Sequence, residues 1–143
     1  MGPIVCATRG SEASRRTQER AIALARERGD PLIFLFVVDA AFVRMTNKDL
    51  ADVVADELER LGRRLLSVAQ ARARERDIDA EVAIRHGDVQ QAVDDFLREV
   101  NASMLVIGAP RSSAEHPAFD PAALDEFAAR IRADVGVEVI VVE

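Results

Sequence analysis

Short apolar runs alternate along the chain with longer segments in which apolar residues recur every three or four positions. The runs have the length and the bounding turn residues expected of strands. They cover residues 3–8, 32–38, 80–85, 103–107 and 137–142. Because helix-period segments separate them, the pattern predicts βαβ units: an α/β fold with a five-stranded, mostly parallel sheet sandwiched by helices.

The pattern within each run indicates where its strand lies in the sheet. Residues 32–38 are apolar without interruption, which is typical of a strand covered on both faces. Residues 80–85 alternate apolar and polar positions, so we expect this strand near an edge. Residues 137–142 close the βαβ series, and we expect them at the other edge. At 143 residues the chain is long enough for one domain with one core.

Four helices are predicted between the strands, each with its own start signal. Ser11 can cap the first, whose inward stripe is Thr17, Ala21, Leu24 and Ala25, and Gly29 ends it. Two apparent capping boxes, Thr46 with Asp49 and Asp88 with Gln91, begin the second and third. Asp120 and Pro121 begin the fourth. The second helix is long, and its apolar positions predict an inward face made of Leu50, Val53, Val54, Leu58, Leu61, Leu65 and Val68.

Composition narrows the possible partners. The net charge of −6 disfavours nucleic acid, which requires a basic face. Cys6 is the single cysteine and lies in an apolar run, which predicts a buried structural thiol and a reducing compartment. The chain begins almost directly with a strand, and no apolar run approaches the length of a membrane span. We therefore expect a cytoplasmic protein that does not bind a membrane.

The end of the fourth strand is the most informative place for function. Residues 104–108, Met-Leu-Val-Ile-Gly, lead into a loop at the carboxyl edge of the sheet, where ligands of parallel α/β proteins bind. A phosphate-cradling loop needs further glycines, so that backbone N–H groups can surround the anion. The segment 111–121 contains none.

Four segments together resemble the universal stress protein family. They are residues 4–14 (Ile-Val-Cys-Ala-Thr-Arg-Gly-Ser-Glu-Ala-Ser), Phe-Val-Val-Asp at 36–39, His-Gly-Asp at 86–88 and Leu-Val-Ile-Gly at 105–108. The match spans essentially the whole chain in the right order. The resemblance implies a Rossmann-like sheet of the adenine nucleotide α-hydrolase type, often dimeric, with an ATP site in one branch of the family.

The glycine motif of the ATP-binding branch is absent here. The family's acidic residue falls at Arg9, its first glycine at Gly108 and its second at Arg111. The final Gly-Ser falls at Pro121-Ala122, or near Asp125-Glu126 if the loop carries an insertion. Proline has no N–H, and a carboxylate pair would repel a triphosphate. The resemblance therefore implies the branch without ATP: a non-catalytic, stress-linked homodimer, joined here through residues 137–142, with an unidentified protein client.

An alternative is that the same edge of the sheet binds a nucleotide or anion by a different design. Arg9 and Arg111 project from strand ends and could hold a phosphate, or could instead be solvated or paired with Asp39, Asp88 or Glu115. No cofactor is expected, since both ATP and AMP are disfavoured. If a nucleotide or anion does bind, the candidate cleft residues are Thr8, Arg9, Val38, Gly87, Gly108 and Arg111.

Other chemistry finds little support. His86 and His116 are expected on separate loops without a further ligand at metal-binding spacing. Ser112 and Ser113 lack an activating base. A related hydrolase needs a glycine-rich pyrophosphate loop or paired histidines after the first strand, and a phospho-receiver needs clustered acids where Arg9 stands. We therefore expect no enzyme.

Overall fold

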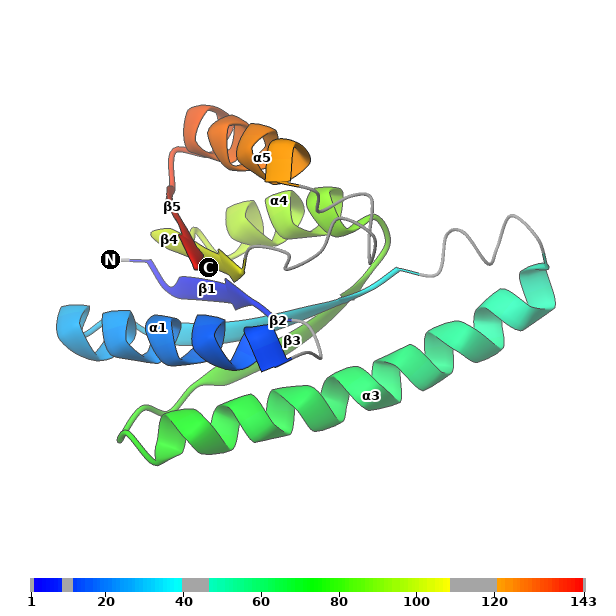
Figure 1. The fold of residues 1–143 in the computed structure, drawn as a ribbon, viewed down its shortest axis with the longest axis horizontal. Helices are drawn as coiled ribbons and strands as arrows, with labels where there is room; N and C mark the ends of the chain where they lie inside the picture. The colour runs from blue at the N-terminus through cyan, green and yellow to red at the C-terminus, as the bar shows by residue number, and fades with distance from the viewer. Residues whose placement is uncertain (1, 9–11, 40–46, 109–120, 143) are drawn as a thin grey trace.

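The computed structural model of this chain describes residues 2–8, 12–39, 47–108 and 121–142. Within them the chain alternates strand and helix from end to end (Figure 1). The strands are β1 (Ile4–Ala7), β2 (Leu32–Val38), β3 (Glu81–His86), β4 (Met104–Gly108) and β5 (Glu138–Val142). The helices are α1 (Glu12–Arg28), α3 (Lys48–Arg74), α4 (Val89–Glu99) and α5 (Pro121–Asp134).

The five described strands form one parallel sheet in the order β3-β2-β1-β4-β5. Ile4 of β1 aligns with Leu32 on one side and with Met104 on the other. This confirms the predicted fold class. The edge positions expected for β3 and β5 are also confirmed, since each has one neighbour in the described sheet.

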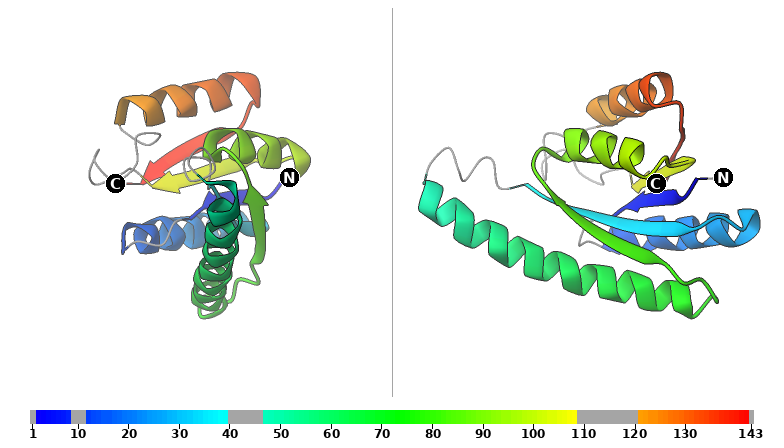
Figure 2. Two further views of the ribbon diagram at one scale, coloured as in Figure 1. Left: turned by 90° about the vertical axis from the view of Figure 1, so that its right-hand side faces the viewer. Right: turned by 180° about the vertical axis from the view of Figure 1, so that it is seen from behind.

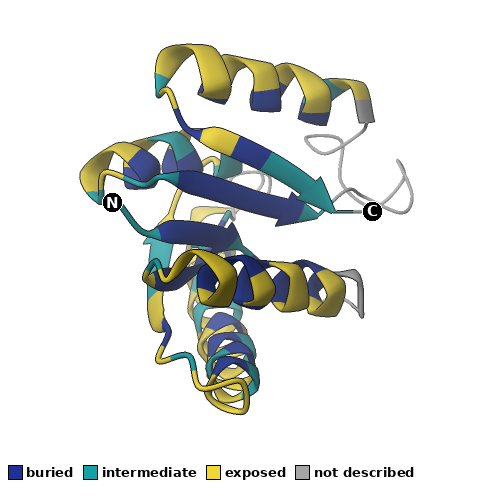
Figure 3. Ribbon diagram, turned by 90° about the vertical axis from the view of Figure 1, so that its left-hand side faces the viewer, coloured by how far each residue is buried: buried dark blue, intermediate teal, exposed yellow. Residues whose placement is uncertain are grey.

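Helices cover both faces of the sheet. Helices α1 and α3 lie on one face, and α4 and α5 on the other (Figure 2). The central strands β1, β2 and β4 are buried along almost their whole length, whereas the helices are buried only on their inner sides (Figure 3). Alternate residues of each strand belong to opposite cores: Phe34 packs toward α1 and α3, and Leu35 toward α4 and α5.

Two of the predicted helix starts need correction. The side chain of Asn47, not Thr46, caps α3: its Oδ1 accepts from the N–H of Leu50 at 3.1 Å. Asp88 caps α4 as predicted, with Oδ2 accepting from the N–H of Gln91 at 3.0 Å. The Gln91 amide, however, donates to Asp95 instead of reaching back to the cap, so α4 has a single cap and no capping box.

Other predicted boundaries can be compared directly. Gly29 follows α1 with φ +70°, the left-handed geometry expected where that helix ends. Strand β3 continues through His86, so the expectation that this histidine lies on a loop is wrong. Ser11 and Asp120 lie outside the described residues.

The apolar face of α3 is only partly inward, which corrects the sequence expectation. Leu58 and Leu65 pack against the core, but Leu50, Val53, Leu61 and Val68 are between 47% and 58% exposed. For the first two the reason is length, because a helix of 27 residues spans about 40 Å. Its N-terminal end projects past the sheet (Figure 1), which leaves Leu50 and Val53 exposed, although Leu58 of the same half packs against the core. Leu61 and Val68 lie further along α3, so their exposure does not come from this projection.

Cys6 is buried in β1, as predicted. Its Sγ donates to the carbonyl oxygen of Thr17 at 3.9 Å, and burial raises the pKa of the thiol far above its usual range. It is therefore a structural side chain. Each described helix is too short or too polar to cross a bilayer.

Candidate functional site

A cavity of about 240 Å³ opens at the carboxyl ends of β1, β2 and β4. This volume lies just below the range of about 300–1,000 Å³ typical of small-molecule sites. The described part of its wall is mostly apolar and comes from three strands and three helices. Its lining residues are Ala7, Thr8, Leu35, Phe36, Val37, Asp39, Leu58, Leu61, Val89, Val93, Ile107, Gly108 and Phe127.

Two polar side chains stand out in this wall. Thr8 follows β1 directly and is buried; its N–H donates to the carbonyl of Leu35 at 2.9 Å. Asp39 follows β2 and is half-buried. The lining thus combines an apolar pocket with one hydroxyl and one carboxylate at its strand ends.

The Thr8 hydroxyl is held by a chain of hydrogen bonds that crosses two helices. The Nε2 of Gln18, buried in α1, donates to Thr8 Oγ1 at 2.8 Å. The Nη1 of Arg72, in α3, donates to Gln18 Oε1 at 2.6 Å. Because an unpaired buried amide would carry a large desolvation cost, this chain fixes the Thr8 side chain relative to α1 and α3.

The candidate residues named from sequence do not all meet at the cavity. Thr8 and Gly108 line it. Val38 is absent from the described lining, and its side chain packs in the core on the α1 and α3 face. Gly87 follows β3 with φ +127°, and its N–H donates to the Val38 carbonyl at 2.9 Å. The remaining candidates, Arg9 and Arg111, lie outside the described residues, as do Ser112, Ser113, Glu115 and His116.

Gly108 has a packing role that requires no ligand. A Cβ added there would lie 2.6 Å from the Thr17 Oγ1 of α1, which is closer than real Cβ contacts. Glycine therefore allows α1 to approach the end of β4. The Val-Ile-Gly ending of β4 is thus explained by helix packing, whether or not a phosphate binds beyond it.

Sequence reasoning did not identify the helical residues that line the cavity. Leu58 and Leu61 come from α3, Val89 and Val93 from α4, and Phe127 from α5. Leu58, Val93 and Phe127 recur with the same helical spacing as core residues. Periodicity alone therefore cannot distinguish residues that line the cavity from residues that fill the core. Their common signal is that all lie on helix turns facing the carboxyl ends of the strands.

Ionisable groups away from the cavity form ordinary surface pairs. The Nε2 of His86 lies 2.9 Å from Glu59 Oε1, and the hydrogen bond from His86 lowers the pKa of the Glu59 carboxyl. Both side chains are substantially exposed at the β3 edge. The described residues contain no group of three or more side chains suited to hold a metal ion.

Comparison with known proteins agrees with this architecture. The model of the universal stress protein family matches residues 1–143. No curated protein matches the sequence at a significant level.

Three solved structures illustrate the likeness. A universal stress protein family member from Burkholderia pseudomallei is 21% identical with a TM-score of 0.75, covering 99% of this chain and 95% of its own. A universal stress protein in complex with cAMP is 24% identical with a TM-score of 0.71, covering 99% and 97%. The Archaeoglobus fulgidus protein in complex with dAMP is 23% identical with a TM-score of 0.66, covering 100% and 98%. At these identities the structures support the fold alone, whereas the family match spans the full length. The chain belongs to the universal stress protein family.

Proposed function

We propose that this chain is a non-catalytic regulatory domain of the stress response that does not bind ATP in the family's usual mode. The observation that carries the proposal is the small apolar cavity at the carboxyl edge, whose described polar side chains are Thr8 and Asp39. A triphosphate needs converging N–H donors and positive charge, and this wall supplies a carboxylate instead.

The sequence beyond β4 supports the same conclusion. A backbone cradle requires glycines after Gly108, and the chain has Arg111 and Pro121 where the ATP-binding branch has glycine. Proline supplies no N–H donor. The described lining of the cavity contains one hydroxyl and one carboxylate and no histidine, lysine or cysteine, which favours a binding or regulatory role over catalysis.

Titration of the protein with Mg-ATP is expected to release no saturable heat and to leave the midpoint of thermal unfolding unchanged. A ligand that binds only the folded state must raise stability by mass action, so both readouts report the same binding. Calorimetry and thermal shift at matched magnesium are the measurements. Saturable binding of one ATP per chain would contradict the proposal. If only weak, non-saturating anion binding is seen, Arg9→Ala and Arg111→Ala should reduce it.

A second candidate is a switch that binds an adenine mononucleotide. Two observations favour it: the cavity wall contains the aromatic rings of Phe36 and Phe127, and relatives of the same fold are solved with cAMP and dAMP. A single phosphate would place less charge near Asp39, and Arg9 and Arg111 could neutralise it. Val89→Phe, which fills the cavity from α4, should abolish AMP or cAMP binding, whereas Val82→Phe on exposed β3 should not.

We also propose that β5 pairs with its own copy in a homodimer. In the described sheet, β5 bonds to β4 on one side, and Val139 lies in the core beside partly buried Val141. The other side of such an apolar edge needs a partner.

Val141→Lys should remove the contact made by β5, lowering the particle mass in light scattering. Circular dichroism should confirm that the fold is retained. A wild-type protein that is already monomeric would show that this edge is covered in another way.

A further inference from the structure

Helix α3 carries an apolar stripe that stays about half exposed in the folded chain, although one of its residues, Leu61, also lines the cavity. Leu50, Leu61 and Val68 are separated by eleven and seven residues, about three and two helical turns, so they lie along one line, with Val53 beside it. Each is about half exposed. The described residues include one other large apolar side chain of comparable exposure, Val82 on β3, so this surface is concentrated on α3.

The same helix is divided sharply by charge. Residues 48–59 carry five carboxylates and one lysine, and residues 60–74 carry five arginines and no carboxylate. The helix dipole favours acids in the first turn and bases in the last, but its effect fades within a turn of each end. It does not explain a division that continues to the middle of a 27-residue helix.

This arrangement is complementary to itself when reversed. Leu61 is the midpoint of Lys48–Arg74, so a two-fold axis there sets the carboxylate-bearing residues 49–59 of one helix alongside the basic half of another. Glu57 and Arg64 lie four and three residues from the axis on opposite sides and would meet across it. Lys48, the one base in the acidic half, would lie opposite Arg74, with Glu75 beside that arginine. A parallel pairing would oppose like charges.

At Val68, its C-terminal end, the stripe borders a groove. Between α1 and α3 lies this groove of about 380 Å³, lined by Arg15, Glu19, Ile22, Val68, Ala71, Arg72, Glu75 and Arg76. The groove has three arginines against two carboxylates, and Arg15 and Arg72 already bond to Glu19 and Gln18. This excess of positive charge and the apolar side chains of the groove are complementary to the N-terminal end of α3, where Leu50 and Val53 stand among carboxylates. In the reversed pairing, that end of one copy reaches the groove of the other.

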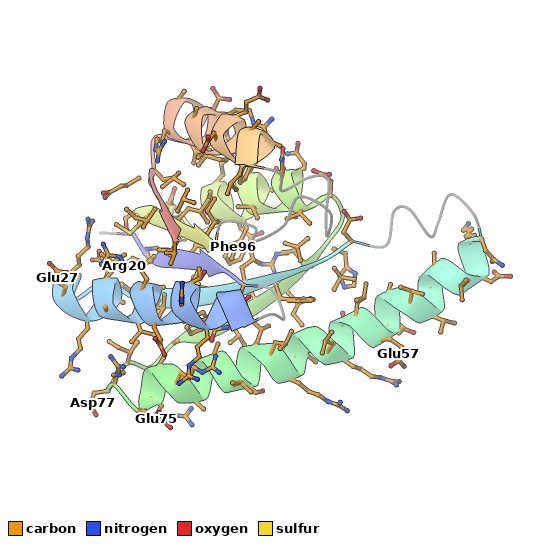
Figure 4. The ribbon with its side chains drawn as sticks, viewed as in Figure 1. Arg20, Glu27, Glu57, Glu75, Asp77 and Phe96 are labelled. Carbon is orange, nitrogen blue, oxygen red and sulfur yellow. The ribbon has the colours of Figure 1, made fainter. Side chains whose placement is uncertain are left out.

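The competing contacts within one chain are weak. Glu57 pairs with Arg60 at 3.0 Å, and all four side-chain groups in this pair and the Glu59–Arg63 pair face solvent to a substantial degree. Glu57 of α3 and Glu75, which follows the helix, both project away from the sheet (Figure 4). A second helix can therefore approach without displacing a buried contact.

We propose that a second copy of this chain docks antiparallel on α3, with Leu61 at the two-fold axis and the N-terminal half of each α3 in the α1–α3 groove of the other. The contact is separate from the β5 edge and does not depend on any ligand. It gives the projecting half of α3 a partner for its exposed apolar side chains.

The proposal is tested in the Val141→Lys background, in which pairing through β5 is blocked. Light scattering should still find a dimer, and adding Val53→Lys should halve its mass. Adding Val82→Lys instead, on an exposed apolar residue of β3 that is not part of the α3 stripe, should leave the dimer intact. A monomer in the Val141→Lys background, or a dimer that survives Val53→Lys, would overturn the proposal. Dissociation by Val82→Lys would also count against it.

Charge reversal gives an independent test in the same background. The pair Asp49→Arg and Glu57→Arg places arginines against the second copy's basic half, and the pair Arg64→Glu and Arg74→Glu places carboxylates against its acidic half. Each double variant alone should be monomeric, because like charges then face each other in both symmetry-related halves of the contact. Mixed together they should form a heterodimer, because every charged pair is again opposite. Failure of the mixture to associate, with both variants folded by circular dichroism, would contradict the antiparallel arrangement.

Discussion

Phe34→Ala should lower the free energy of unfolding by about 3–5 kcal/mol, the usual cost of removing a buried aromatic ring from a core. Phe34 is the third residue of β2 and is fully buried, between Cys6 of β1 and Val82 of β3. Its ring packs in the core beneath α1 and α3. Urea unfolding followed by circular dichroism measures the change.

Two further variants distinguish the loss of this buried ring from a general sensitivity of the sheet to substitution. Phe34→Leu keeps most of the apolar volume and should cost clearly less than the alanine variant. Val82→Ala, on the neighbouring exposed strand, should change stability little. Equal losses for Phe34→Ala and Val82→Ala would contradict the assignment of the core.

Gly62→Val should destabilise the protein by about 1–3 kcal/mol through overpacking. A Cβ at residue 62 would lie 2.4 Å from the ring of Phe36, so α3 can approach β2 only where it has no side chain. The same ring lines the cavity, and the substitution should therefore also change its shape. Thermal unfolding and denaturant titration measure the loss of stability.

Two further variants test whether the loss of stability comes from the contact with Phe36. Ser67→Ala lies on an exposed position of the same helix and should be neutral or slightly stabilising, because alanine favours helix. Phe36→Leu combined with Gly62→Val should recover part of the loss, since the smaller side chain leaves room for the new methyl groups. Strict additivity of the two substitutions would show that the close approach of α3 to Phe36 is wrong.

The sheet could be predicted from sequence because its strands have distinct patterns. The uninterrupted run at 32–38 forms a central strand, β2, and the alternating run at 80–85 corresponds to the edge strand β3. Strand ends shifted by a residue or two, as for His86, because pairing continues as far as a neighbour offers hydrogen bonds. The βαβ connections predicted parallel strands, and the strand patterns predicted the two edges, whereas the order of the three central strands was not predicted.

The exposure of α3 could not be predicted in the same way. The spacing of apolar residues indicates which side of a helix is apolar, but it does not indicate how far the sheet beneath that helix extends. Leu50 and Val53 follow the same rule as Leu58, yet they lie beyond the strands. The cap at Asn47 was missed because Thr46 offers a similar side chain one residue earlier.

The sequence predicted where the candidate site lies, but it did not predict most of the residues that line it. Strand ends predicted Thr8 and Gly108, and both line the cavity. Val38 and Gly87 meet each other through a backbone hydrogen bond outside the described lining, a relation that depends on strand register. The apolar residues from α3, α4 and α5 converge only in three dimensions. The roles of Arg9 and Arg111 remain predictions.

Native mass spectrometry of the protein, purified and then equilibrated with Mg-ATP, tests most directly whether this family member lacks the usual ATP mode. The account predicts spectra in which each subunit has the mass of the polypeptide alone, because Asp39 lines the cavity and the sequence after Gly108 lacks the further glycines of a phosphate-binding loop. Subunits that retain one ATP each after desalting, and that release it on unfolding, would contradict the account.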